Sequence, residues 1–113
     1  MIPSQMLKGT LEGCILKIID SEETYGYEIS QKLQKYGFGD ISEGTIYPLL
    51  LRLSKGDFVT TIYKNSNAGP KRKYFQITEK GKAELQLFEV HWKEMDNAVN
   101  HLFKGGNYET ERT

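Results

Sequence analysis

The stretch ISEGTIYPLLLRLSKGDFV, residues 41–59, is the part of the chain that decides the fold. Ser42 is suited to cap the free backbone N–H groups of a helix, and Glu43 complements the positive end of the helix dipole. One apolar stripe follows at the helical period: Ile46, Leu49, Leu50 and Leu53. The pattern predicts a helix over residues 43–55 with small polar groups at its exposed N-terminal end, which is what a DNA-reading helix needs.

A β-hairpin is predicted directly after this helix. Gly56 and Asp57 supply a helix stop, and residues 58–63 then alternate as a strand does. The loop over residues 64–70 turns the chain, and residues 71–77 return it as a second strand. Basic residues gather near the turn, so the hairpin has the form of a wing beside the helix.

Two further helices are predicted before residue 41. Apolar residues recur at helical spacing over residues 7–19, and the single cysteine, Cys14, is most simply a small core residue on the inner face of that helix. A polar connection at residues 20–24 leads to a helix over residues 25–36, and a glycine-rich turn follows at residues 36–40. Helix, helix, turn, helix is the outline of a helix-turn-helix unit.

A long helix with a narrow apolar seam is predicted near the C-terminus. Thr78 is suited to cap a helix over residues 79–103, which would be about 37 Å long. The seam residues recur at alternating spacings of three and four: Leu85, Phe88, Trp92, Met95, Val99 and Leu102. A monomer would leave this edge in water, so we predict a C2 homodimer held by the same helix of a second chain. Residues 105–113 have no period and are expected to form a disordered tail.

Size and charge narrow the class of protein. The 113 residues suit one domain, and 38% hydrophobic with 27% charged residues is ordinary for a soluble globular protein. No apolar run approaches the length of a membrane helix and no signal peptide is recognisable, so we expect a cytoplasmic protein without membrane contact. Zero net charge argues against a nucleic-acid partner, but residues 56–82 hold six basic and two acidic side chains. This local excess is compatible with a small DNA footprint.

The sequence contains no pattern that indicates a catalytic site or a metal site. His91 and His101 are ten residues apart with no second ligand at helical spacing, so we expect no metal site. Paired carboxylates, a Ser/His/Asp arrangement and a phosphate-binding glycine loop are not found, and we expect neither an enzyme nor a bound cofactor.

With these parts placed, the chain resembles the PadR family of winged-helix transcriptional regulators. Five segments in the same order carry the resemblance: Leu7-Lys8-Gly9, Tyr25-Gly26-Tyr27-Glu28-Ile29, Gly44-Thr45-Ile46-Tyr47-Pro48, Arg72-Lys73-Tyr74 and Thr78-Glu79-Lys80-Gly81. Asp57 stands where the family commonly has glycine, but aspartate tolerates the left-handed conformation of such a turn. The resemblance implies a mainly α fold of the α+β class. It comprises a winged helix-turn-helix over residues 1–78, with a two-stranded β-wing, and a C-terminal dimerisation helix over residues 79–104.

The resemblance also implies a homodimer that binds a pseudo-palindromic operator in double-stranded DNA, usually as a repressor. In some short members of the family, a planar aromatic molecule binds between the subunits, stacks on a tryptophan of the last helix and releases the DNA. Trp92 occupies the matching place, and Phe88 and Met95 are candidates to line the same pocket. The simpler alternative for Trp92 is an anchor of the dimer seam.

The residues expected to contact DNA come from three places. The third helix offers Ser42, Glu43, Gly44, Thr45, Tyr47 and, near its far end, Arg52. The wing offers Lys64, Lys71, Arg72 and Lys73, and the start of the first helix offers Gln5 and Lys8. Strand alternation places Arg72 on the opposite face from Lys71 and Lys73. The third helix has no Asn or Gln to read adenine, so we expect DNA shape or water to supply much of the specificity.

Two alternatives stay open at this point. The polar residues of the third helix are also explained by capping and packing alone, and the basic cluster by a solvated hairpin. A second hypothesis therefore keeps the winged-helix fold as a module that binds a protein or a small molecule without specific DNA binding.

Overall fold

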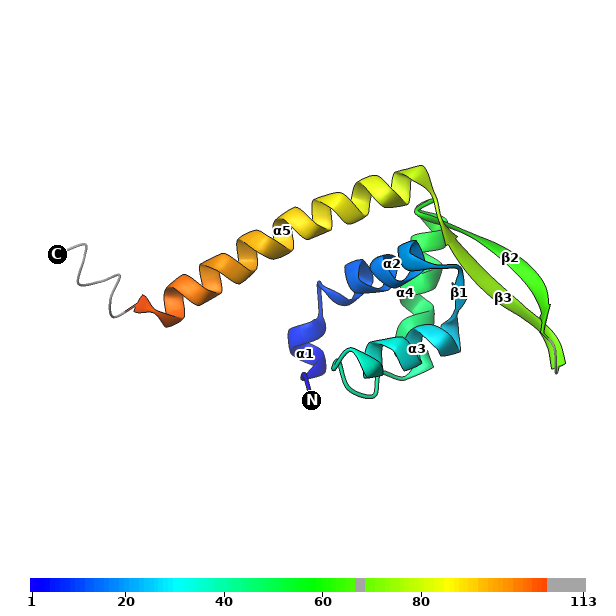
Figure 1. Cartoon of the computed structure of the whole chain (residues 1–113), viewed down its shortest axis with the longest axis horizontal. Helices are drawn as coiled ribbons and strands as arrows, with labels where there is room; N and C mark the ends of the chain where they lie inside the picture. The colour runs from blue at the N-terminus through cyan, green and yellow to red at the C-terminus, as the bar shows by residue number, and fades with distance from the viewer. Residues whose placement is uncertain (67–68, 106–113) are drawn as a thin grey trace.

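The described part of the chain folds into five helices and a three-stranded sheet. The computed structural model describes residues 1–66 and 69–105, so the tail expected to be disordered lies outside them from residue 106 on. The elements follow in the order α1 (Ser4–Leu7), α2 (Leu11–Ser21), β1 (Thr24–Tyr25), α3 (Gly26–Lys35), α4 (Glu43–Lys55), β2 (Val59–Ser66), β3 (Gly69–Ile77) and α5 (Glu79–Phe103). Figure 1 shows α1 to α4 gathered in one body, with the β2–β3 hairpin projecting on one side and α5 running out on the other. The predicted order of helices, hairpin and long last helix is confirmed.

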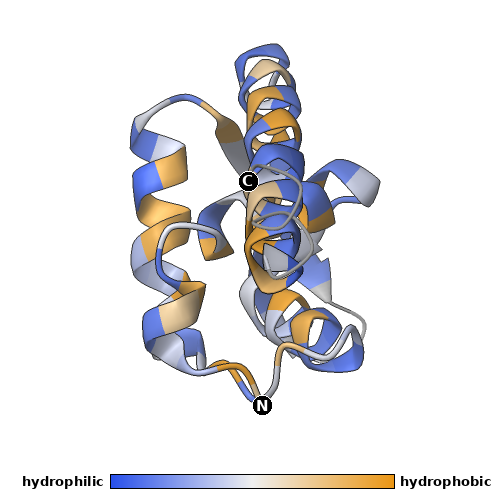
Figure 2. Cartoon of the chain, turned by 90° about the vertical axis from the view of Figure 1, so that its left-hand side faces the viewer, coloured by the Kyte–Doolittle hydropathy of each residue, from blue (hydrophilic) through white to orange (hydrophobic). Residues whose placement is uncertain are grey.

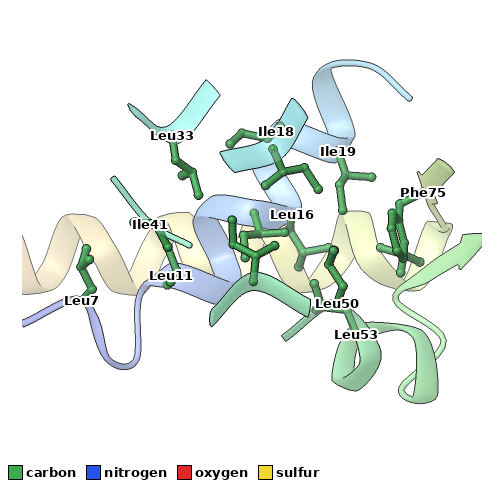
Figure 3. Packing of buried hydrophobic residues seen from close by; sticks show 14 residues of the cluster. Leu7, Leu11, Leu16, Ile18, Ile19, Leu33, Ile41, Leu50, Leu53 and Phe75 are labelled. Carbon is green, nitrogen blue, oxygen red and sulfur yellow. The ribbon is translucent and has the colours of Figure 1, made fainter. Parts of the chain in front are cut away.

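One hydrophobic core joins the helices to the sheet. Ile15, Leu16 and Ile19 of α2 are at most 2% exposed, and Phe75 of β3 packs with them (Figure 3). The stripe predicted for α4 is buried at three positions, and the fourth, Leu49, is partly buried against the same core. The periodicity of the sequence therefore predicted the inner face of α4 correctly.

The predicted first helix, residues 7–19, is wrong at its start. α1 ends at Leu7, and the backbone turns before α2 begins at Leu11. Gly9 has a φ of +94°, a conformation that side chains disfavour, and the Thr10 hydroxyl donates a hydrogen bond to the carbonyl of Leu7 at 3.0 Å. Leu7 is nevertheless buried in the core. The apolar spacing in the sequence is therefore regular from Leu7 into α2, although the helix is interrupted between them.

The predicted two-stranded wing is part of a sheet of three antiparallel strands. The extra strand, β1, pairs Thr24 with Phe75 and Tyr25 with Tyr74, which gives the order β1-β3-β2. Thr24 is completely buried, whereas the sequence predicted a polar connection over residues 20–24. A strand of two residues is too short to show an alternating pattern, so only its pairing with β3 reveals it.

The joint between α4, the hairpin and α5 is held by hydrogen bonds. Asp57 ends α4 with a φ of +62°, as predicted from the tolerance of aspartate for this conformation. Thr78 caps α5: its Oγ1 accepts from the backbone N–H of Gly81 at 2.9 Å and donates to the carbonyl of Asp57 at 2.7 Å. Lys80 Nζ donates to the carbonyl of Gly56 at 2.8 Å. These contacts fix the start of α5 to the end of α4.

α5 is divided into a part that packs on the core and a part whose side chains are exposed. Near its start, the Phe88 ring lies so close to Gly13 of α2 that no side chain larger than hydrogen fits between them. Every side chain over residues 89–103 is exposed in the single chain. Figure 2 shows hydrophobic positions in orange among hydrophilic positions in blue along the helices, and α5 is one of these helices. The C-terminal half of α5 thus adds no buried side chain to the core of its own chain.

Candidate nucleic-acid interface

The N-terminal turn of α4 presents small polar groups to solvent. Ser42 caps the helix, because its Oγ accepts a hydrogen bond from the backbone N–H of Thr45 at 3.3 Å, which confirms the predicted cap. The hydroxyl oxygens of Ser42 and Thr45 lie 3.2 Å apart, and both residues are exposed. Around Gly44 the surface is open, since an added Cβ would meet only Ser42 Oγ, at 3.7 Å. These hydroxyls and the free backbone N–H groups can hydrogen-bond to a phosphate or a base edge.

Tyr47 belongs both to the surface and to the packing of α4 on α3. Its side chain is 47% exposed. The phenol end lies against Gly26, where an added Cβ would come within 2.7 Å of the Tyr47 hydroxyl oxygen. Partial burial, and after it the negative charge of Glu43, raises the pKa of the Tyr47 phenol above its usual value. Tyr47 therefore keeps its phenol proton and fits both predicted alternatives: one part of its side chain packs on α3, and the other part is exposed at the surface.

Arg52 is engaged inside the chain. Its Nε donates to Glu12 Oε2 of α2 at 2.9 Å, and the arginine side chain stays 70% exposed. Arg52 was predicted as a DNA contact, and its ion pair with Glu12 was not predicted. Forty positions separate the two residues, so no local pattern indicates the pair.

A groove between α1, α2 and α4 brings predicted residues from distant parts of the sequence together. Its volume is about 850 Å³, and it adjoins the N-terminal end of α4. Five of the residues expected to contact DNA line it: Gln5, Lys8, Ser42, Thr45 and Arg52. The first helical segment and the third helix therefore form one continuous surface.

The outer face of the hairpin, the face that carries Tyr74, holds its cations in place. Arg72 stacks with its guanidinium carbon 4.5 Å from the centre of the Tyr25 ring, and this ring meets Tyr74 edge-on at 5.2 Å between centroids. Lys64 lies 5.3 Å from the centre of the Tyr74 ring and forms an ion pair with Glu23. The charge of Lys64 is thus offset by a carboxylate, whereas Arg72 is oriented by an aromatic ring.

The inner face of the hairpin, the face that carries Phe75, holds the remaining two wing lysines. Lys73 Nζ lies 5.8 Å from the centre of the Phe75 ring, so Lys73 and Arg72 contact rings on opposite faces, as strand alternation predicts. Lys71 is two residues earlier on the same face, and both lysines are exposed. Neither forms an ion pair with the described part of the chain.

The predicted seam of α5 separates into two groups of residues. Leu85 packs partly buried against the core of its own chain, and Phe88 packs on α2. Trp92 is 47% exposed, and the residues after it in the seam, Met95, Val99 and Leu102, are exposed as well. The dimer contacts assigned to all six residues remain a prediction, and the four exposed ones are available for it.

A second cleft, of about 740 Å³, lies between α2, the end of α3 and α5. Cys14, Leu85, Phe88 and Trp92 are among its lining residues, whereas Met95 is not. Burial raises the pKa of the Cys14 thiol, and Cys14 packs partly buried against the core, in line with its predicted inward position. Two of the three predicted ligand-binding residues therefore share one cleft.

Residues 1–66 and 69–105 contain neither a metal-binding group of side chains nor a helix suited to span a membrane. Within these ranges, no group of three or more His, Cys, Asp or Glu side chains is arranged to hold a metal ion. None of the helices in the same ranges combines the length and the apolar character that crossing a membrane requires.

These features define a class of protein. A helix with an exposed, capped N-terminal turn, packed on two shorter helices and followed by a hairpin with basic residues, is a winged helix-turn-helix. Residues 15–87 match the Transcriptional regulator PadR-like family, and the chain belongs to this family. Its members are transcriptional regulators and not enzymes.

Individual relatives agree with this assignment. A Lysinibacillus sphaericus protein named "Uncharacterized protein X" is 34% identical over 107 residues, which cover 93% of this chain and 98% of the relative. The crystal structure of a PadR-like transcriptional regulator from Bacillus cereus is 55% identical, with a TM-score of 0.81 over 88% of this chain and 97% of the other. Bacillus subtilis PadR, solved in complex with operator DNA, is 25% identical, with a TM-score of 0.66 over 73% of this chain and 48% of that protein.

Proposed function

We propose that this chain is a homodimeric repressor that binds a pseudo-palindromic operator through the N-terminal end of α4 and the hairpin. The observation that carries the proposal is the exposed N-terminal turn of α4, which adjoins the groove between α1, α2 and α4. Figure 1 shows the hairpin projecting from the same body. Small polar groups at a helix end suit the major groove, and the hairpin supplies cations for phosphates or the minor groove. The fold shared with Bacillus subtilis PadR, which was solved with operator DNA, supports DNA as the partner.

The exposed apolar residues of α5 support the homodimer. A stripe of apolar side chains that includes Trp92, at 47% exposure, and Met95, at 58%, is exposed to solvent in the single chain. A second copy of α5 would cover these residues by heptad packing. Such a dimer presents two copies of α4, which must lie about 34 Å apart to enter successive major grooves.

The cleft beside Trp92 supports an effector site. Its volume lies within the usual range of ligand pockets, and a half-exposed tryptophan offers a flat surface to a planar aromatic molecule. A ligand wedged beside α5 would change the distance between the two α4 helices, so ligand and DNA would prefer different dimers.

A mobility-shift assay with the DNA upstream of its own gene tests the proposal, with and without planar aromatic compounds. We expect a shift at low salt that one class of compound reverses. The alternative, a module that binds a protein or small molecule, is favoured by the pairing of Arg52 and Lys64 with carboxylates. Absence of any shift at low salt, where even non-specific binding is detectable, would decide for this alternative.

A further inference from the structure

The outward face of α4 is apolar in the middle of the helix. Leu51 is 54% exposed, and Tyr47, one turn earlier, is 47% exposed. Pro48 is exposed beside them. At 3.6 residues per turn, Leu51 points away from the side on which Leu53 is buried at 1% exposure. Leu51 is therefore an outermost side chain of this helix and contributes little to the core.

The polar groups that usually read bases are missing from the same face. α4 contains no Asn or Gln. Its single arginine, Arg52, is held through Nε by Glu12 of α2. Among the four bases, only thymine presents an apolar group in the major groove, the C5 methyl, and apolar side chains recognise it by contact. The chemistry of this face therefore matches thymine better than guanine, adenine or cytosine.

We propose that Leu51, with Tyr47 and Pro48 beside it, selects thymine by contact with its C5 methyl group. The inference rests on the proposed function, because it places the outward face of α4 in the major groove. It is continuous with the exposed N-terminal end of the same helix, since Tyr47 lies about one turn from Gly44 on the same face. Removing one methyl from such a contact costs about three- to four-fold in affinity.

The test uses DNA that differs only by this methyl group. The purified protein first selects duplexes from a random-sequence pool, and one enriched duplex is synthesised again with deoxyuridine in place of single thymines. We expect the wild type to lose about three- to four-fold in affinity at one or more thymines of each half-site. Leu51→Ala should bind the thymine and deoxyuridine duplexes equally. Leu87→Ala, which removes a leucine of the same 54% exposure from α5, should discriminate as the wild type does.

Each outcome separates this inference from the proposed function. Equal affinity of the wild type for all deoxyuridine duplexes would overturn the inference, as would unchanged discrimination by Leu51→Ala. Binding to random DNA without enrichment of any sequence would overturn it too, while DNA binding itself would stand. Failure to bind any duplex at low salt would overturn the proposed function. Leu51 is exposed, so the variant should melt at the wild-type temperature, and this is checked first.

Discussion

Removing the two lysines on the inner face of the hairpin tests whether the wing contacts the DNA backbone. Lys71 and Lys73 are exposed and form no ion pair within the described chain. If each neutralises one phosphate, the double variant Lys71→Gln with Lys73→Gln loses two contacts per chain and four per homodimer. Each contact contributes about 0.9 to the slope of log affinity against log salt, so the slope should become shallower by about 3.6.

The change is large enough to measure by fluorescence anisotropy of a labelled duplex. Between about 50 and 200 mM salt, wild-type affinity should fall about 150-fold further than that of the double variant. Lys64→Gln is the matched control, because Lys64 is on the same hairpin but already paired with Glu23. Its slope should stay close to that of the wild type. An unchanged slope in the double variant, or an equal decrease in Lys64→Gln, would refute the reasoning.

Three further predictions concern the dimer, the packing of α5 and the response to pH. Trp92→Glu places a charge in the proposed seam, so sedimentation should show a monomer, and a persistent dimer would contradict the heptad assignment. Gly13→Ala forces a Cβ into the Phe88 ring and should lower the free energy of unfolding by about 1–3 kcal/mol in a denaturant titration, whereas adding Phe88→Ala should abolish this clash. The raised pKa of Tyr47 means that the folded state disfavours its ionised form, so the wild type should lose stability as the pH rises above the ordinary tyrosine pKa of about 10. Tyr47→Phe should lose less over the same pH range in thermal melts, and an identical loss would exclude Tyr47 as the source.

Features that depend on neighbouring residues were predicted from the sequence. The cap at Ser42 and the cap at Thr78 each join a side chain to a backbone N–H three residues further on. The stop at Asp57 depends on one residue's tolerance for a positive φ. The buried stripe of α4 follows from the helical period alone. Such signals lie within one or two turns of the chain, where a single sequence is informative.

Features that depend on distant partners were missed. Thr24 joins the sheet because it pairs with Phe75, which is far away in the sequence. Arg52 is held by a hydrogen bond to Glu12 of α2, which is forty positions away. The break at Gly9 was hidden, because the residues on both sides of it contribute to one core. For the site, residue types indicated which side chains are suited to contact DNA. The carboxylates that pair with Arg52 and Lys64 could be identified only from the folded structure.

The hydrogen-bonded joint at Gly56, Asp57 and Thr78 has a mechanical consequence. It makes α5 a lever arm of about 37 Å that is clamped to the end of α4 and to the root of the hairpin. A rotation of about 5° at the clamp corresponds to a movement of roughly 3 Å at the far end of the arm. Because Leu85 and Phe88 also pack the start of α5 on the core, a partner that pushes on the far end acts on α2, α4 and the hairpin together.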